Sequence, residues 1–259
     1  MQDWFKFWLE LPIPAIFATL FIFYLASATF MVWLSFRSKL SVRIRSYKGL
    51  VAPFFVSTAT IFGLLVGFLS SDIWERNKQA ERAVLTESDT LLALHSLAAA
   101  SGVEDTRLRT AIRNYVEAVV EDEWPRLAME QRSARADAAL NALVHEVAVP
   151  QTLKDGSVQR TMLDMVLKIR AAHEDRVLLS NDRTMVTKWA AVLLLALITQ
   201  IAIAAVHLEN PRPQLAALVI FTVAAVSILG LLAVHEAPFE PPVFVPPGPI
   251  ANVLAQVPK

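Results

Sequence analysis

The sequence contains no cysteine and only seven glycines, and these shortages exclude several classes of function. Without cysteine the chain has no disulfide, no iron–sulfur cluster and no thiolate nucleophile. Its glycines form neither GxGxxG nor GxxxxGK[ST], the two common phosphate-binding loops. No G-x-S-x-G nucleophile motif occurs, and we identify no catalytic residue. We therefore do not expect an enzyme.

The chain also lacks an excess of positive or negative charge, since 24 basic residues balance 24 acidic ones. A neutral chain has no strong electrostatic attraction for nucleic acid, which we do not expect as a partner. Three of the five histidines directly precede a glutamate, but none forms H-E-x-x-H. Adjacent residues of a helix point about 100° apart and make poor joint ligands, so we predict no metal site and no cofactor.

Hydrophobic residues, by contrast, make up 55% of the chain, more than a globular interior can bury. Four stretches of about twenty residues or more lack Asp, Glu, Lys and Arg, and about twenty apolar residues cross a bilayer core of roughly 30 Å as a helix. These stretches predict an integral membrane protein that spans the lipid bilayer four times. The predicted spans are Pro14–Leu34, Val51–Leu69, Trp189–Val206 and Leu215–Val234.

A polar segment separates the second span from the third and carries 19 of the 24 acids. Its apolar residues recur at helical spacing, which predicts a helical bundle. The expected helices are Trp74–Ala99, a segment from about Glu104 that Trp124-Pro125 interrupts, Ala134–Val149, and one from Val158 to a break at Ser180-Asn181-Asp182. The predicted fold is an all-α membrane protein with two spans, a helical insert and two more spans. The predicted domains are 1–71, 72–187, 188–235 and a proline-rich tail, 236–259.

The tail contains seven of the fourteen prolines, and its segment 241–247 is expected to be extended. Its apolar side chains require a surface to cover them, either the insert or a neighbouring chain.

The first span has two interpretations, because Leu25-Ala26-Ser27-Ala28 resembles a signal-peptidase site. The apolar run continues to Leu34, which favours a retained helix. Aromatic residues before it are typical of a membrane interface: Trp4, Phe5, Phe7 and Trp8.

The connection 35–48 carries five basic residues and no acid, so the positive-inside tendency favours the cytoplasm for this loop. An even number of spans would then place both termini and the insert outside the cell.

One face of the second span consists of small and weakly polar residues on a helical wheel: Ala59, Thr60, Gly63, Gly67, Ser70 and Ser71. One interpretation is close helix packing through a small-xxx-small pattern. The other is a narrow pore with a hydrophobic gate at Phe62.

Thr199 and Gln200 provide polarity in the third span, where Gln200 needs a hydrogen-bond partner on another helix or in water. The spans contain no ionisable Asp, Glu, Lys or Arg, which argues against proton-driven transport.

Several of these residues resemble a family of bacterial four-span membrane proteins called bestrophin-like. The resemblance covers nearly the whole chain and rests on the run from Ile61 to Phe68, on Trp74 and Tyr115, and above all on one motif of four residues. That motif is Asp122-Glu123-Trp124-Pro125. The chain departs from the family at Glu130 and Pro241, where glycine is common, and at Ala134, where proline is common.

The resemblance implies kinship with bestrophins, ring-shaped pentameric anion channels whose second span lines the pore and whose polar region is cytosolic. It implies a multi-pass protein of the bacterial inner (plasma) membrane. The first functional hypothesis is a homo-oligomer that passes small inorganic ions, most readily anions. The alternative is a membrane-anchored interaction or sensing module without transport. The implied cytosolic insert disagrees with the external placement that the basic loop favours.

Overall fold

A computed structural model describes residues 2–47, 53–101, 106–148 and 156–257. Lys48, Val51, Glu104 and Val149, which belong to segments predicted above, lie outside the described residues. The chain forms two compact units. We call Met1–Trp74 with Thr184–Glu236 the membrane unit, and Glu75–Arg183 with Ala237–Lys259 the polar unit.

The membrane unit contains four helices that are long and apolar enough to cross a bilayer, counted among the described residues. They are α2 (Ile13–Phe36), the first part of α4 (Pro53–Ala100), α9 (Val186–Val206) and α10 (Pro211–Val234). Two short helices, α1 (Gln2–Leu9) and α3 (Ser41–Arg45), flank α2. The predicted fold of an all-α membrane protein with four spans is therefore confirmed.

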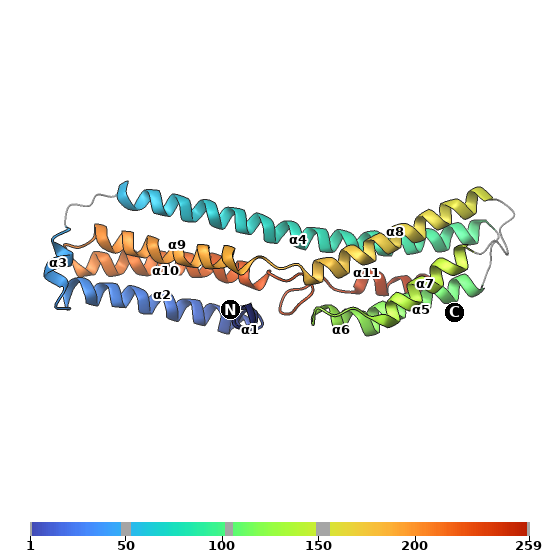
Figure 1. Cartoon of the computed structure of the whole chain (residues 1–259), viewed down its shortest axis with the longest axis horizontal. Helices are drawn as coiled ribbons and strands as arrows, with labels where there is room; N and C mark the ends of the chain where they lie inside the picture. Colours follow the sequence, from blue (N-terminus) through green and yellow to red (C-terminus); the bar gives the residue numbers. More distant parts are fainter. Residues whose placement is uncertain (1, 48–52, 102–105, 149–155, 258–259) are drawn as a thin grey trace. The chain divides into compact units, whose positions relative to one another are not determined.

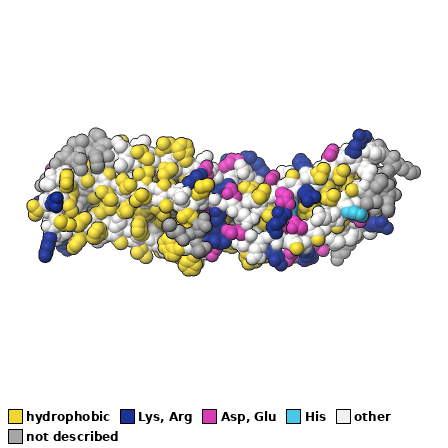
Figure 2. Space-filling model, in the orientation of Figure 1, with side chains coloured by type: hydrophobic (Ala, Val, Ile, Leu, Met, Phe, Trp, Pro, Cys, Tyr) yellow, Lys and Arg dark blue, Asp and Glu magenta, His cyan; other side chains and the backbone are white. Residues whose placement is uncertain are grey.

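Helices α2, α9 and α10 pack against one another (Figure 1). The α2–α10 contact is especially close, because a Cβ added to Gly230 would lie 2.5 Å from the Phe17 ring. At one end of the unit, the rings of Phe5 and Trp8 from α1 contact Trp189 of α9. Hydrophobic side chains cover most of the visible face of this unit, as a helix bundle in lipid requires (Figure 2).

The polar unit is built from the remaining part of α4 and from helices that surround one hydrophobic core. These are α5 (Thr106–Ala118), η1 (Val119–Glu123), α6 (Trp124–Leu127), α7 (Ala134–Ala148), α8 (Gly156–Asn181), α11 (Gly248–Ala251) and α12 (Val253–Gln256). Lysine, arginine and acidic side chains appear over its visible surface (Figure 2). No strand occurs among the described residues, in agreement with the predicted all-α fold.

Two predicted elements are joined in the structure, because α4 is a single helix of 48 residues. From the sequence, one helix was expected to end near Leu69 and another to begin near Trp74. Neither glycine nor proline occurs between these two residues, so nothing stops the helix from continuing. By contrast, α8 ends at Asn181, within the predicted break.

The proline-rich tail packs on the polar unit. Ile250, Val253 and Val257 are fully buried in that unit's core. The Ser88 hydroxyl donates a hydrogen bond of 2.8 Å to the Pro249 carbonyl. Of the two surfaces that the sequence left open, the insert therefore covers these side chains. Exposed apolar tail residues are Val243 and Phe244.

Candidate functional site

The small-residue face of α4 is turned away from the chain's other helices. Thr60, Gly63, Gly67 and Ser71 are exposed, whereas Ala59 and Ser70 are half-buried. A Cβ placed on Gly63 or Gly67 would meet no atom of this chain within 4 Å. These glycines therefore do not serve close packing within the chain, and their face is uncovered by it.

A second exposed stripe on α4 consists of large apolar residues, Ile61, Leu64 and Phe68. Phe62, which the sequence analysis named as a gate, lies on neither stripe. Its ring is buried and contacts Phe221 of α10, with 5.7 Å between the ring centroids. The structure thus places Phe62 in the core of the membrane unit.

The polar side chains of α9 bond to neighbouring backbone and side chains. Gln200 Nε2 donates to the Tyr24 carbonyl of α2 at 3.1 Å and to Thr222 Oγ1 of α10 at 2.9 Å. Thr199 Oγ1 donates to the Leu195 carbonyl of its own helix at 2.8 Å. Gln200 thus links three membrane helices.

A second buried glutamine, Gln214, was not predicted from the sequence. Gln214 is fully buried, and its Nε2 donates to the Ala204 carbonyl at 2.7 Å. It lies in the first turn of α10, just before the predicted span, where a polar residue is expected to meet the membrane surface. One signal in the sequence was available: proline often begins a helix, so Pro211 indicates that α10 starts before Gln214 and includes it.

The polar unit contains a buried ionic cluster around Arg176 of α8. Arg176 Nε donates to Glu87 Oε2 at 3.0 Å, and its Nη1 donates to Glu123 Oε1 at 2.5 Å. The Tyr115 hydroxyl donates to Glu87 Oε1 at 2.5 Å and lies 3.2 Å from His173 Nδ1. All five side chains are buried. Two carboxylates and one guanidinium leave one uncompensated negative charge unless a proton is shared within the cluster.

The motif Asp122-Glu123-Trp124-Pro125 supplies part of this cluster through an unusual backbone. Residues Val119–Glu123 form the π-helix η1, and helix α6 begins directly afterwards with Pro125 in its first turn. A π-helix shifts the direction of the side chains that follow it, and such bulges are frequent at functional sites. Glu123 is fully buried in this arrangement, although runs of acidic residues such as Glu121-Asp122-Glu123 usually form a solvated face.

Trp124 and Asp122 hold the surroundings of the cluster. The Arg176 guanidinium lies over the Trp124 ring, 5.1 Å from its centroid. Asp122 accepts hydrogen bonds from Arg126 Nε at 3.1 Å and from Ser133 Oγ, whose own oxygen accepts from the Ala136 amide in the first turn of α7. Asp122 thus contacts the start of α7 through Ser133, whereas Glu123 and Trp124 contact Arg176 of α8.

Glu130 is the one non-glycine residue with positive φ among those described, at 56°. This left-handed conformation favours glycine, so a glutamate at this position is strained. Arg183 Nε donates to Glu130 Oε1 at 2.8 Å.

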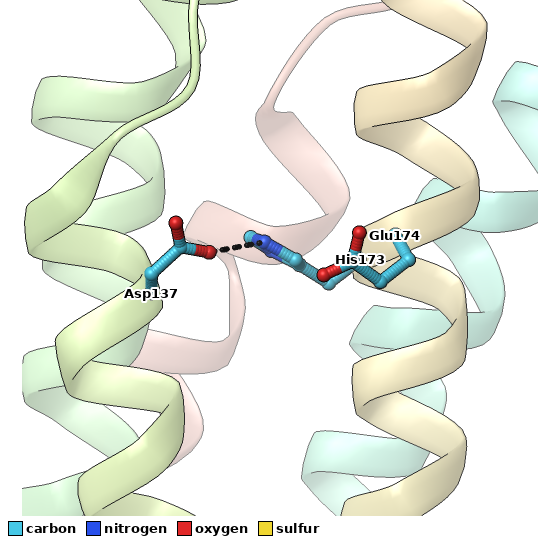
Figure 3. Close-up of side chains that lie close together, drawn as sticks. All are labelled: Asp137, His173 and Glu174. Carbon is cyan, nitrogen blue, oxygen red and sulfur yellow. Dashed lines mark ion pairs between the residues drawn. The ribbon is translucent and has the colours of Figure 1, made fainter.

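Beside the cluster, the ligand atoms of Asp137, His173 and Glu174 lie within 4.8 Å of one another. Figure 3 shows His173 directed at Asp137, with 3.4 Å between Nε2 and Oδ1. Arg132 donates to both oxygens of Glu174, at 2.7 and 3.0 Å, and to Asp137 at 3.2 Å. A divalent cation would have to displace this guanidinium, so the arrangement favours an ion-pair network over a metal site.

The pKa values in the polar unit follow from these contacts. Burial and the nearby Glu87 carboxylate raise the pKa of Tyr115 well above 10. Burial alone would lower the pKa of Arg176, but Glu87 and Glu123 raise it above its ordinary value. The hydrogen bonds from Arg132 lower the pKa of Glu174.

Comparison with known proteins gives one family and one fold. A family model described as the bestrophin-like domain matches residues 22–250. A crystal structure of a bacterial bestrophin homologue from Klebsiella pneumoniae has a TM-score of 0.71 at 11% identity, over 92% of this chain and 96% of that chain. A point mutant of that homologue has a TM-score of 0.73 at 11% identity, over 93% of this chain and 96% of that chain. No significant match is found among proteins of curated function. Because the family model matches most of its length, this chain belongs to the bestrophin-like family.

Proposed function

We propose that the chain assembles into a homo-oligomeric ring in a bacterial inner membrane and conducts small anions passively. The small-residue face of α4 lines the path in this proposal. The observation that carries it is the exposure of Gly63 and Gly67, around which the chain itself provides no packing partner. Family membership supports it, because the kinship with bestrophins implies that the second span lines a pore.

The chemistry of this face suits a passive path. It carries no charged side chain, and its glycines expose backbone between the hydroxyls of Thr60 and Ser71. A neutral, weakly polar lining allows an ion to enter and leave without binding tightly. Phe62 is not part of this proposal as a gate, since its ring lies in the core against Phe221. The stripe of Ile61, Leu64 and Phe68 is assigned to the contact with a neighbouring copy.

The test is chloride flux from liposomes that contain the purified protein, with empty liposomes as the baseline. Gly63→Leu is expected to lower flux at least about tenfold while the oligomer persists, because the added side chain narrows the path. Ala224→Leu, at an exposed position of α10, is the matched control and is expected to leave flux unchanged.

Two results would contradict the proposal. The first is a ring oligomer without chloride flux above that of empty liposomes. The second is that Gly63→Leu prevents assembly while Phe68→Ala alters the chloride conductance. The stripe of large apolar residues would then line the path, and the small-residue face would contact a neighbouring copy.

The alternative function is a membrane-anchored interaction or sensing module. Exposed apolar residues on α8 of the polar unit favour it, among them Leu167 and Leu178, the latter 64% exposed. Such side chains are typical of surfaces that bind another protein. An absence of flux together with a stable complex of the polar unit with a partner would favour this function.

We further propose that the insert faces the outside of the cell, as the basic residues of 35–48 favour. A reporter fused after Lys259 tests this, because four spans place the tail on the same side as the insert. A cytoplasmic reporter would reverse the orientation and agree with the placement that bestrophin kinship implies.

A further inference from the structure

An apolar groove of about 880 Å³ runs between α2 and α9 within the membrane unit. Its walls include Ile22, Ala26 and Phe30 from α2 and Leu197 and Ile201 from α9. Ile44 of α3 and the following Tyr47 line one end. These two residues bound the groove where the chain leaves α2 for the basic connection.

The dimensions of the groove match one leaflet of a bilayer. Its lining on α2 extends from Ile22 to Ser35, which is roughly 20 Å at 1.5 Å per residue. Half of a bilayer's hydrocarbon core is roughly 15 Å deep. A lipid acyl chain would thus find apolar walls along its whole length.

Exposed basic residues lie in α3 and in the turn that precedes it, near the end of the groove that Ile44 and Tyr47 line. Arg37, Lys39, Arg43 and Arg45 are exposed, and none of them forms an ion pair with a described residue. The Arg45 guanidinium lies 5.9 Å from the centroid of the ring of Phe36, the last residue of α2. The connection contains no acid, so no counter-charge lies within it.

We propose that this groove binds an anionic phospholipid, with an acyl chain between α2 and α9 and the phosphate against Arg43 and Arg45. Arginine binds phosphate through geometrically matched pairs of N–H donors. Basic residues beside a membrane surface also attract anionic lipids electrostatically. The site is separate from the α4 face, and its occupation does not depend on whether the chain conducts ions.

A second copy of the chain is the competing occupant. The second copy would carry the same basic connection. Near this end, the acid that it could offer to these cations is Glu209. Like charges at close range oppose such a contact. An anionic phospholipid satisfies both features of the site, because its acyl chain suits the apolar walls and its phosphate neutralises the exposed cations.

The experiment measures lipid binding to the purified full chain by native mass spectrometry, with phosphatidylglycerol compared with phosphatidylcholine. We expect phosphatidylglycerol to bind at least about tenfold more tightly. Arg43→Gln combined with Arg45→Gln is expected to remove most of this preference. The control is Lys168→Gln with Arg170→Gln, which removes the same charge from exposed positions on α8 of the polar unit.

A second pair of variants tests the groove itself. Ala26→Trp fills it and is expected to lower the bound phosphatidylglycerol about tenfold, whereas Ala224→Trp at an exposed position of α10 is expected to leave it unchanged. Equal binding of the two lipids, or an unchanged preference in the double arginine variant, would overturn the proposal. So would an Ala26→Trp protein with a changed oligomer number and undiminished lipid binding, since a second copy would then occupy the groove.

Discussion

Arg176 and Glu87 form a paired hydrogen bond in the core of the polar unit, through Nε at 3.0 Å and Nη2 at 3.1 Å, and neither side chain is exposed to solvent. A charge pair so far from water is stable only while its partners remain in place. The pair joins α4 to α8, and Glu123 extends it to the π-helix. The cluster therefore determines which helix faces meet in this unit.

Replacing the central cation is expected to be strongly destabilising. Arg176→Gln leaves the buried carboxylates of Glu87 and Glu123 without a counter-charge, and losses of this kind cost about 3–5 kcal/mol. The free energy of unfolding of the full chain in detergent is the measurement. Arg170→Gln, an exposed arginine of the same helix, is the control and is expected to change it by less than about 0.5 kcal/mol.

The raised pKa of Tyr115 predicts a loss of stability in alkaline solution. In the unfolded chain a tyrosine ionises near pH 10, whereas burial and Glu87 keep Tyr115 protonated above that pH in the folded chain. Its contribution is fully present below about pH 10, and above it the free energy of unfolding falls by about 1.4 kcal/mol per pH unit. We expect Tyr115→Phe to lack this component, so that its deficit relative to wild type shrinks between about pH 10 and pH 11. A deficit independent of pH would contradict this, and Tyr47→Phe, which removes an exposed hydroxyl, is the control.

The spans were predictable from sequence because a bilayer imposes one simple requirement, about twenty apolar residues without charge. The end of α8 was predictable for a similarly local reason, a run of turn-forming residues at Ser180 to Asp182. The burial of Glu123 was not, because it depends on one extra residue in a helical turn, and no composition rule marks a π-helix. Neither was the approach of Asp137 to His173, which requires the packing of α7 on α8.

The orientation of the α4 face was only half predictable. A helical wheel correctly groups Thr60, Gly63 and Gly67 on one side, since it needs only the helical period. Which sides of α4 the other spans cover depends on the packing of α2, α9 and α10, which hydrophobicity cannot specify when all sides are apolar. For that reason Phe62 could not be assigned to the core beforehand.

Gln200 is expected to contribute modestly to the stability of the membrane unit. Gln200→Leu removes its hydrogen bonds to the Tyr24 carbonyl and to Thr222 Oγ1. Hydrogen bonds between membrane helices contribute on average about 0.6 kcal/mol each and at most about 1.7 kcal/mol. A double-mutant cycle with Thr222→Val measures the coupling from unfolding in detergent. A coupling of zero would show that the Gln200–Thr222 bond is of no energetic consequence.

Two glycines of the membrane unit are expected to respond oppositely to the same substitution. In Gly230→Ala the new methyl group would lie 2.5 to 2.7 Å from three atoms of the Phe17 ring, so α2 and α10 must separate or the ring must turn. Overpacking of this kind costs about 1–3 kcal/mol. Gly63→Ala meets no atom of the chain within 4 Å and adds a better helix former, so unfolding of the monomer should be unchanged or slightly harder. Unfolding measured at concentrations below and above the assembly threshold separates the chain's own packing from that between copies. If Gly63→Ala destabilises the assembled protein as much as Gly230→Ala destabilises the monomer, the α4 face is a packing surface between copies and does not line a path for ions.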